Sequence, residues 1–207
     1  MKPLRELLKA KKGIVGIEAA IVLIAFVVIA AALSYVVINM GFFATQKTKE
    51  TIGSGMEEAT SALQLDGSVI AKTGNSTTSI EYIVFPVKLS VGKSQVDLGE
   101  NSVVVSVYLA NATLLDIYNG TSNATDWTTL MSAVGDDEAK FAIFNGDTDT
   151  VLESTEKAFL AIHLDTDHQL SEYETIKIEV KTGRGAALTV VRTAPGGMTE
   201  DSFVDLG

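Results

Sequence analysis

The stretch "AKKGIVGIEAAIVLIAFVVIAAALSYVVIN", residues 10–39, contains a run of about 25 apolar residues directly after two lysines and a glycine. A helix of that length rises about 37 Å at 1.5 Å per residue. This exceeds the roughly 30 Å hydrocarbon core of a bilayer. The segment is therefore predicted to form a membrane-spanning helix, and it carries one acid, Glu18, near its start.

Charge is divided unevenly along the 207 residues. The leader, residues 1–13, carries +4 and the whole chain −10, so the remainder carries −14. Such an acidic body argues against nucleic acid binding, which depends on basic side chains that neutralise phosphates. The basic leader predicts retention on the cytoplasmic side of an anionic membrane, with export of the body.

The chain lacks cysteine, which excludes disulfides, thiolate metal sites and a cysteine nucleophile. Its histidines, His163 and His168, are too few for a His-rich metal site. We find no nucleophile elbow, zinc motif or phosphate-binding loop, so the chain is predicted not to be an enzyme and to need no cofactor.

A secretory signal is one interpretation of the amino-terminal region. The sequence "AAALS", residues 30–34, is similar to a cleavage site after Ala32. A cut there would release a secreted or lipid-anchored binding domain that begins at Leu33. The apolar run before this point is long for a signal, and apolar residues resume after it, so a cut before the run fits better.

The junction at the start of the apolar run resembles the class III signal peptides of type IV pilins and archaeal flagellins (archaellins). The basic pair and the glycine at the third mature position are more similar to the archaeal flagellins. The resemblance implies that a membrane aspartyl peptidase, the preflagellin peptidase, removes residues 1–13 on the cytoplasmic side. The positions that carry the resemblance are Lys11, Lys12, Gly13, Ile14, Gly16 and Glu18.

Cleavage after Gly13 gives the lone acid a partner. A carboxylate in hydrocarbon costs several kcal/mol unless it is paired. The cut creates an α-amine at Ile14, and Glu18 lies one helical turn away, so it can offset that charge within one subunit or between neighbours. Alternatively, Glu18 lies at headgroup depth and is solvated.

Helical spacing continues beyond the apolar run. We predict a long helix over residues 14–63, on the order of 70 Å long, which spans the membrane before assembly and forms a filament core afterwards. Small residues spread among large apolar ones allow close approach of neighbouring helices, although a plain membrane anchor remains an alternative. The glycines in Gly53-Ser54-Gly55 predict a hinge or a helix break.

After Gly67 the period changes from helical to alternating. Short strands separated by turn clusters predict an antiparallel sandwich or barrel in an exported domain, residues 64–207. Pro86 predicts an edge strand or a bulge. The fold class is thus α+β, and the resemblance implies a long hydrophobic α-helix followed by an immunoglobulin-like β-sandwich. The clearest predicted strands are residues 79–91, 101–110, 157–164, 174–182 and 186–193.

Asn-x-Ser/Thr sequons predict N-linked glycans on exposed loops of an exported protein. A Ser/Thr-rich composition also generates sequons without function. The resemblance implies glycosylation, and bulky sugars would shield edge strands. The candidate asparagines are Asn75, Asn111, Asn119 and Asn123.

Asp165 and Asp167 alternate in a turn, where carboxylates can hold a hard cation such as Ca²⁺. Solvated turn aspartates are the alternative interpretation. The single tryptophan, Trp127, lies near the sequons and is predicted to be a packing anchor.

The resemblance implies a structural subunit of the archaeal flagellum, an extracellular filament that drives swimming. Its precursor would sit in the cell membrane with a cytoplasmic leader. The implied partners are further copies, other flagellin subunits, the preflagellin peptidase, and a membrane assembly platform with its ATPase. An archaeal type IV pilin for adhesion is the alternative.

Overall fold

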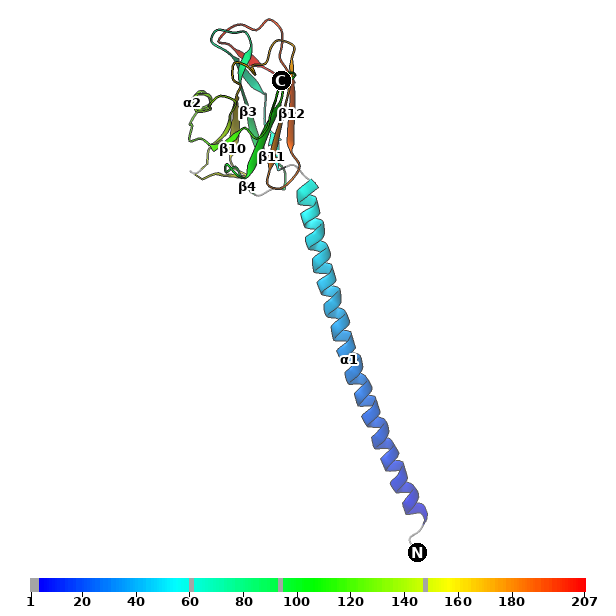
Figure 1. The fold of residues 1–207 in the computed structure, drawn as a ribbon. Helices are drawn as coiled ribbons and strands as arrows, with labels where there is room; N and C mark the ends of the chain where they lie inside the picture. Colours follow the sequence, from blue (N-terminus) through cyan, green and yellow to red (C-terminus); the bar gives the residue numbers. More distant parts are fainter. Residues whose placement is uncertain (1–3, 60–61, 93–94, 147–148) are drawn as a thin grey trace. The chain divides into compact units, whose positions relative to one another are not determined.

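A computed structural model describes residues 4–59, 62–92, 95–146 and 149–207, with side chains from residue 16 onward. The chain divides into two compact units, residues 1–54 and Gly55–Gly207. Figure 1 shows a long helix, α1, followed by a β-rich unit.

The helix α1 spans Leu4–Ala59, 56 residues, which corresponds to about 84 Å. It passes through Gly53-Ser54-Gly55 without interruption, so the predicted break is wrong, although the division between the units falls there. The predicted end at residue 63 is also wrong. The helix ends at Ala59, and Leu63 begins a strand.

The β-rich unit contains a larger and a smaller sheet. Among the described residues the larger sheet has seven strands in the order β13-β2-β3-β10-β8-β7, with β1 also paired to β3. Its strands are β1 (Leu63–Leu65), β2 (Ile70–Thr73), β3 (Ile80–Leu89), β7 (Tyr118–Thr121), β8 (Ala139–Phe144), β10 (Lys157–His163) and β13 (Phe203–Asp205).

The smaller sheet has the order β12-β11-β5-β6, and β4 pairs separately with β9. These strands are β4 (Gln95–Asp97), β5 (Val103–Tyr108), β6 (Thr113–Leu114), β9 (Val151–Glu153), β11 (Thr175–Thr182) and β12 (Leu188–Thr193).

The two sheets enclose one apolar core, so the predicted sandwich is confirmed in outline. Alternate side chains of β3, β10, β5 and β11 point into this core, in keeping with the period of two along a strand. They include Ile83, Phe85, Leu160, Val105, Val107, Ile176 and Ile178, all buried in one cluster.

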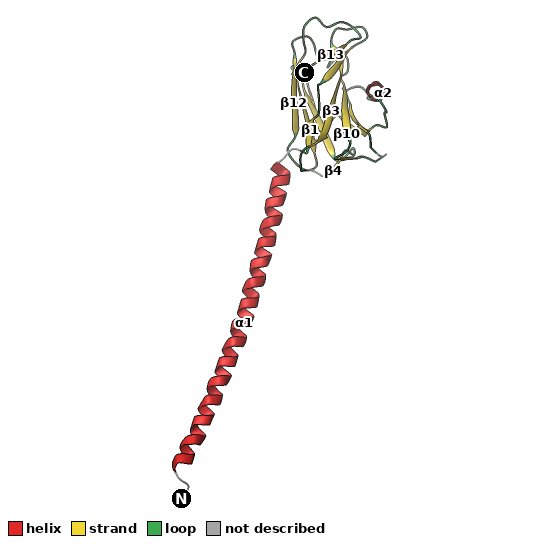
Figure 2. Cartoon of the chain, turned by 180° about the vertical axis from the view of Figure 1, so that it is seen from behind, coloured by secondary structure: helices red, strands yellow, loops and turns green. Residues whose placement is uncertain are grey.

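A second, smaller core lies on the outer face of the larger sheet. A short helix, α2 (Trp127–Ser132), covers β10 there. Figure 2 shows α2 beside β10. Leu130 and Met131 of α2 pack with Ala161 of β10 and Ala142 of β8. Both faces of β8 and β10 are therefore buried.

One strand pair departs from the predicted antiparallel arrangement. Strands β7 and β8 are parallel, and α2 lies in the connection between them. Parallel neighbours need such a crossover because a tight turn can join only antiparallel strands. The sequence pattern did not reveal this short βαβ unit.

Pro86 lies in a central strand, which corrects the predicted edge position. Strand β3 pairs with β10 on one side and with β1 and β2 on the other. The Asp66 amide donates to the Pro86 carbonyl at 3.0 Å. The Pro86 nitrogen faces that same side, where the partner changes from β1 to β2, so a missing N–H is tolerated there.

Two lysines on adjacent strands share one carboxylate. The Nζ of Lys157 lies 2.6 Å and the Nζ of Lys88 2.7 Å from the Asp66 carboxylate. Hydrogen bonds from these lysines hold the pKa of Asp66 below its usual value, and the bond from Lys157 has the larger effect. Burial opposes this shift, because it disfavours the charged carboxylate. The ion pairs connect β3 and β10 to the segment after β1.

We predict that Asp66→Asn lowers the melting temperature of the β-rich unit at neutral pH. Because the folded-state pKa is depressed, this stabilisation is present above the unfolded-state value of about 3.9 and is lost as the pH falls through the folded-state pKa. Thermal unfolding across pH should show the two curves converging in acid. The control Glu200→Gln, at an exposed site, should unfold like wild type, and a pH-independent gap for Asp66→Asn would contradict the assignment.

Candidate assembly helix and surface sites

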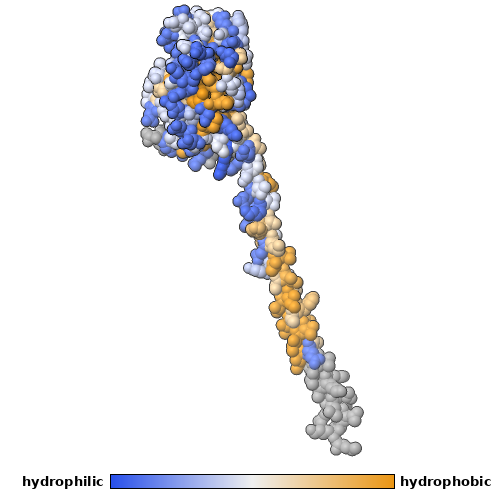
Figure 3. Space-filling view, in the orientation of Figure 1, coloured by the Kyte–Doolittle hydropathy of each residue, from blue (hydrophilic) through white to orange (hydrophobic). Residues whose placement is uncertain are grey.

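The apolar surface of α1 is uncovered. Its large apolar side chains are between 51 and 72% exposed. Scattered apolar residues on a protein surface are normal, but these residues form a continuous surface. Figure 3 shows apolar side chains covering the early part of the helix and polar ones further along. The residues are Ile17, Ile21, Val22, Leu23, Ile24, Phe26, Val27, Val28, Ile29, Leu33, Tyr35, Val36, Val37, Ile38, Met40, Phe42, Phe43, Ile52 and Met56.

This surface extends all round the helix. Residues 21–24 and 26–29 are apolar without interruption, and consecutive residues lie 100° apart around the axis. A helix with one apolar stripe can be satisfied by a single neighbour. This one needs lipid or several neighbouring helices around it.

The glycines of this segment are not required by the chain's own packing. A Cβ atom placed at Gly16 or Gly41 would meet no described atom within 4 Å. Glycine on an apolar helix lets another backbone approach closely.

Hydroxyl groups on α1 are satisfied within the helix. Ser34 donates to the Ala30 carbonyl and Thr45 to the Gly41 carbonyl, each at 2.8 Å. Thr48 and Thr51 make the same bond one turn back. These side chains can therefore enter an apolar environment without leaving an unpaired donor. Sequence reasoning missed this feature.

The polar part of α1 begins after Phe43. Lys47 and Glu50 form an ion pair at 2.7 Å on the exposed surface. From Ile17 to Phe43 the apolar part rises about 40 Å. It is long and apolar enough to cross a membrane.

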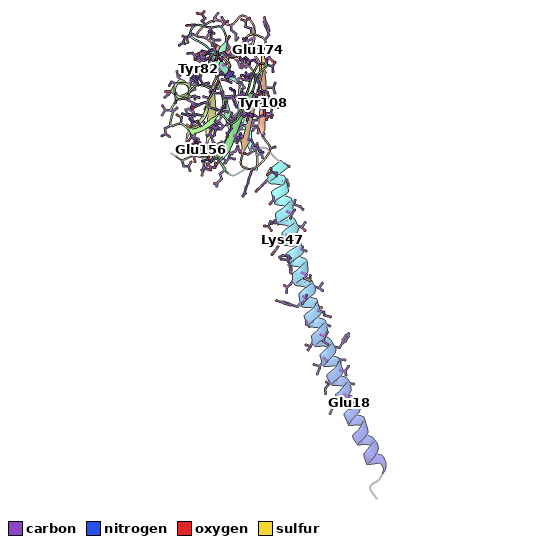
Figure 4. The ribbon with its side chains drawn as sticks, in the orientation of Figure 1. Glu18, Lys47, Tyr82, Tyr108, Glu156 and Glu174 are labelled. Atoms are coloured by element: carbon purple, nitrogen blue, oxygen red, sulfur yellow. The ribbon has the colours of Figure 1, made fainter. Side chains whose placement is uncertain are left out.

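The predicted cleavage residues fall at the start of α1. Lys11, Lys12, Gly13 and Ile14 belong to its backbone span, but their side chains lie outside the described residues. Gly16 and Glu18 are described and exposed. Figure 4 shows Glu18 near the start of the helix. Ile14 and Glu18 are four residues apart, a spacing that places them on the same face of a helix.

All the candidate glycan acceptors are exposed: Asn75, Asn111, Asn119 and Asn123. Asn111 lies two residues before the start of β6, and Asn119 lies on β7. In the described part of the chain, β6 is an edge strand of the smaller sheet and β7 is an edge strand of the larger sheet. Asn119 also donates to Glu138 at 2.9 Å. The positions fit the predicted shielding of edge strands, and glycosylation itself stays a prediction.

The predicted Ca²⁺ pair gains no support from the geometry. Asp165 accepts from the Thr166 amide at 2.6 Å, and its own amide donates to Asp137. Asp167 is exposed. Among the described residues no group of three or more His, Cys, Asp or Glu side chains is placed to hold a metal ion.

The histidines have structural surroundings. His163 stacks on Tyr82, with ring centroids 4.2 Å apart, and its Nε2 lies 3.2 Å from Glu81. His168 Nδ1 lies 2.8 Å from Asp137. The contacts of His163 join β10 to β3, and that of His168 joins the loop after β10 to the loop between α2 and β8.

Trp127 packs against Phe203 of β13, with ring centroids 4.7 Å apart. This contact confirms packing against one neighbour. The contact is incomplete, because Trp127 keeps 36% and Phe203 51% of its surface exposed. Sequence reasoning missed Phe203, which lies in a strand of only three residues.

Comparisons with known proteins agree on one family. The family model for archaeal-type flagellin matches residues 13–192. "Probable flagellin 1" of Aeropyrum pernix is 44% identical, over 97% of this chain and 100% of that protein. "Probable flagellin 1" of Archaeoglobus fulgidus is 33% identical, over 91% of this chain and 92% of its own length.

Solved structures give the same result. A subunit of the archaeal flagellum of Methanospirillum hungatei is 30% identical, with a TM-score of 0.55 over 91% of this chain and 99% of that one. A crystal structure of an archaeal flagellin from Methanocaldococcus jannaschii has a TM-score of 0.59 over 70% of this chain and 95% of that one. At 13% identity, that similarity concerns the fold alone. The chain belongs to the archaeal-type flagellin family.

Proposed function

We propose that this protein is a structural subunit of the archaeal flagellar filament and polymerises through its amino-terminal helix to support swimming. The observation that carries the proposal is the exposed, all-round apolar surface of α1 in a chain of this family. The similarity to a subunit of a solved archaeal flagellum supports it.

Burial of α1 among other copies keeps the assembled filament from dissociating into water. Moving one large apolar side chain out of water is worth about 1.5–3 kcal/mol. The residues between Ile17 and Phe43 together represent tens of kcal/mol before the cost of ordering the subunits is subtracted. Lipid satisfies the same surface before assembly, so the helix can pass from membrane to filament without exposure to water.

Removal of the leader is the switch between these states. A segment of +4 on the cytoplasmic side opposes extraction of the helix from the membrane. Cleavage after Gly13 by the preflagellin peptidase removes that charge and leaves an amine at Ile14.

The remaining steps involve partners. A membrane assembly platform with its ATPase would move the processed subunits, alone or with other flagellins, into an extracellular filament. The acidic body, which carries −14 in total with the helix, would lie on the outside, with N-linked glycans on its exposed asparagines.

We predict that filaments sheared from cells contain chains that start at Ile14. Edman sequencing or mass spectrometry of the mature amino terminus measures this directly. A chain that starts at Leu33 would instead indicate secretion of the β-rich unit and would contradict filament assembly through α1.

Deletion of the gene is predicted to abolish swimming while attachment to surfaces persists. Video microscopy of swimming and an adhesion assay separate the two activities. Loss of attachment with normal swimming would favour an adhesive type IV pilin over a flagellin.

We predict that Glu18→Ala reduces the yield of filaments strongly, since the amine of Ile14 would then be buried without its partner. An unpaired buried charge costs several kcal/mol. Filament yield is measured by electron microscopy and by the protein recovered after shearing. Glu58→Ala, at an exposed site beyond the apolar part of α1, is the matched control. Equal yields from both variants would show that Glu18 is merely solvated.

A further inference from the structure

An exposed aromatic pair lies where α2 begins. Trp127 and Phe203 contact each other at an interplanar angle of 54°, so the two rings form a tilted surface. The contact leaves 36% of Trp127 and 51% of Phe203 exposed. Exposed apolar patches of this kind mark binding surfaces.

The apolar surface continues onto the neighbouring strand. Phe203 pairs with Lys72, and Ile70 with Asp205, in the register between β13 and β2. Side chains two residues apart on a strand share a face. Ile70, 37% exposed, therefore lies on the same face as Phe203.

Charged groups surround this surface. Asp126 caps α2 through the Thr129 amide at 2.7 Å, and this hydrogen bond lowers the pKa of its carboxyl. Lys72 pairs with Asp201 at 2.9 Å. Aromatic faces with hydrogen-bonding groups at the rim match the chemistry of a sugar, which has a C–H face and hydroxyl edges.

A candidate glycan acceptor lies within reach. Asn123 is exposed and precedes Trp127 by four residues, a span of about 14 Å at most. The next residue, Ala124, is buried in the core beneath α2 with Leu130. This contact holds the sequon against the same face of the larger sheet, and the four-residue span keeps Asn123 within about 14 Å of Trp127 along the backbone.

We propose that Trp127 and Phe203 form a docking platform for the carbohydrate attached to Asn123. The C–H face of a sugar ring packs on the negative face of the aromatic rings, and its hydroxyls bond to the neighbouring charged groups. The bound glycan covers the apolar patch and orders the sugar along the domain surface. This inference rests on the proposed export and glycosylation of the protein.

The experiment uses the chain's single tryptophan as a reporter. Filaments of wild type and variants are isolated from cells, and acrylamide quenching of Trp127 fluorescence is measured. Asn123→Gln and Thr125→Ala each remove the sequon, Thr125→Ser keeps it, and Asn75→Gln removes a sequon elsewhere. We expect the quenching constant to rise roughly twofold in the first two variants, since one aromatic face becomes open, and to stay unchanged in the other two.

Three results would overturn the platform. One is unchanged quenching in both Asn123→Gln and Thr125→Ala. Another is mass spectrometry that shows no glycan on Asn123. The third is a quenching constant that rises when the filament is dissociated but does not change when the sequon is removed. That result would mean that a second copy of the chain covers the patch. Filaments that still form in every variant separate these failures from a failure of the proposed assembly function.

Discussion

The apolar surface of α1 is the constraint on which the rest of this protein depends. A helix whose large side chains are more than half exposed on every face cannot remain in water. Lipid and a bundle of identical helices both satisfy it, because both remove the apolar surface from water. Export and polymerisation are therefore two consequences of one sequence feature.

The details of α1 suit a buried destination. Serine and threonine hydroxyls bond to carbonyls of the preceding turn, so they bring no unpaired donor into the bundle. Gly16 and Gly41 leave space that the chain itself does not fill. Glu18 is the exception, and the proposed cleavage after Gly13 would give it a partner in the new amine at Ile14.

The β-rich unit buries its apolar residues without lipid or neighbouring copies. Its core lies between two sheets, and α2 covers a second core on the larger sheet. Asn111 and Asn119 lie at strands that end the two sheets among the described residues. Glycans at those positions would block pairing with the edges of other copies. The unit can thus stay folded and soluble while α1 changes its surroundings.

Much of this architecture was predictable from sequence. The apolar run predicted the helix, and alternating apolar residues predicted β3, β5, β10, β11 and β12. Strand β8, whose two faces are buried like those of β10, was missed. The parallel pairing of β7 and β8, the position of Pro86 and the exposure of Phe203 depend on contacts between distant segments, which no local pattern encodes. The glycines at residues 53 and 55 did not break the helix, since their cost of about 1 kcal/mol each is small against the propagation of so long a helix.

The central claim is that α1 is buried in the assembled filament. The chain has no cysteine, so single substitutions can report exposure without interference. Intact filaments of Phe26→Cys and Val104→Cys variants, one on α1 and one on the exposed face of β5, would be treated with a water-soluble maleimide. We expect labelling of the β5 position alone, with labelling on α1 only after the filament is dissociated. Equal labelling of both positions in intact filaments would contradict it.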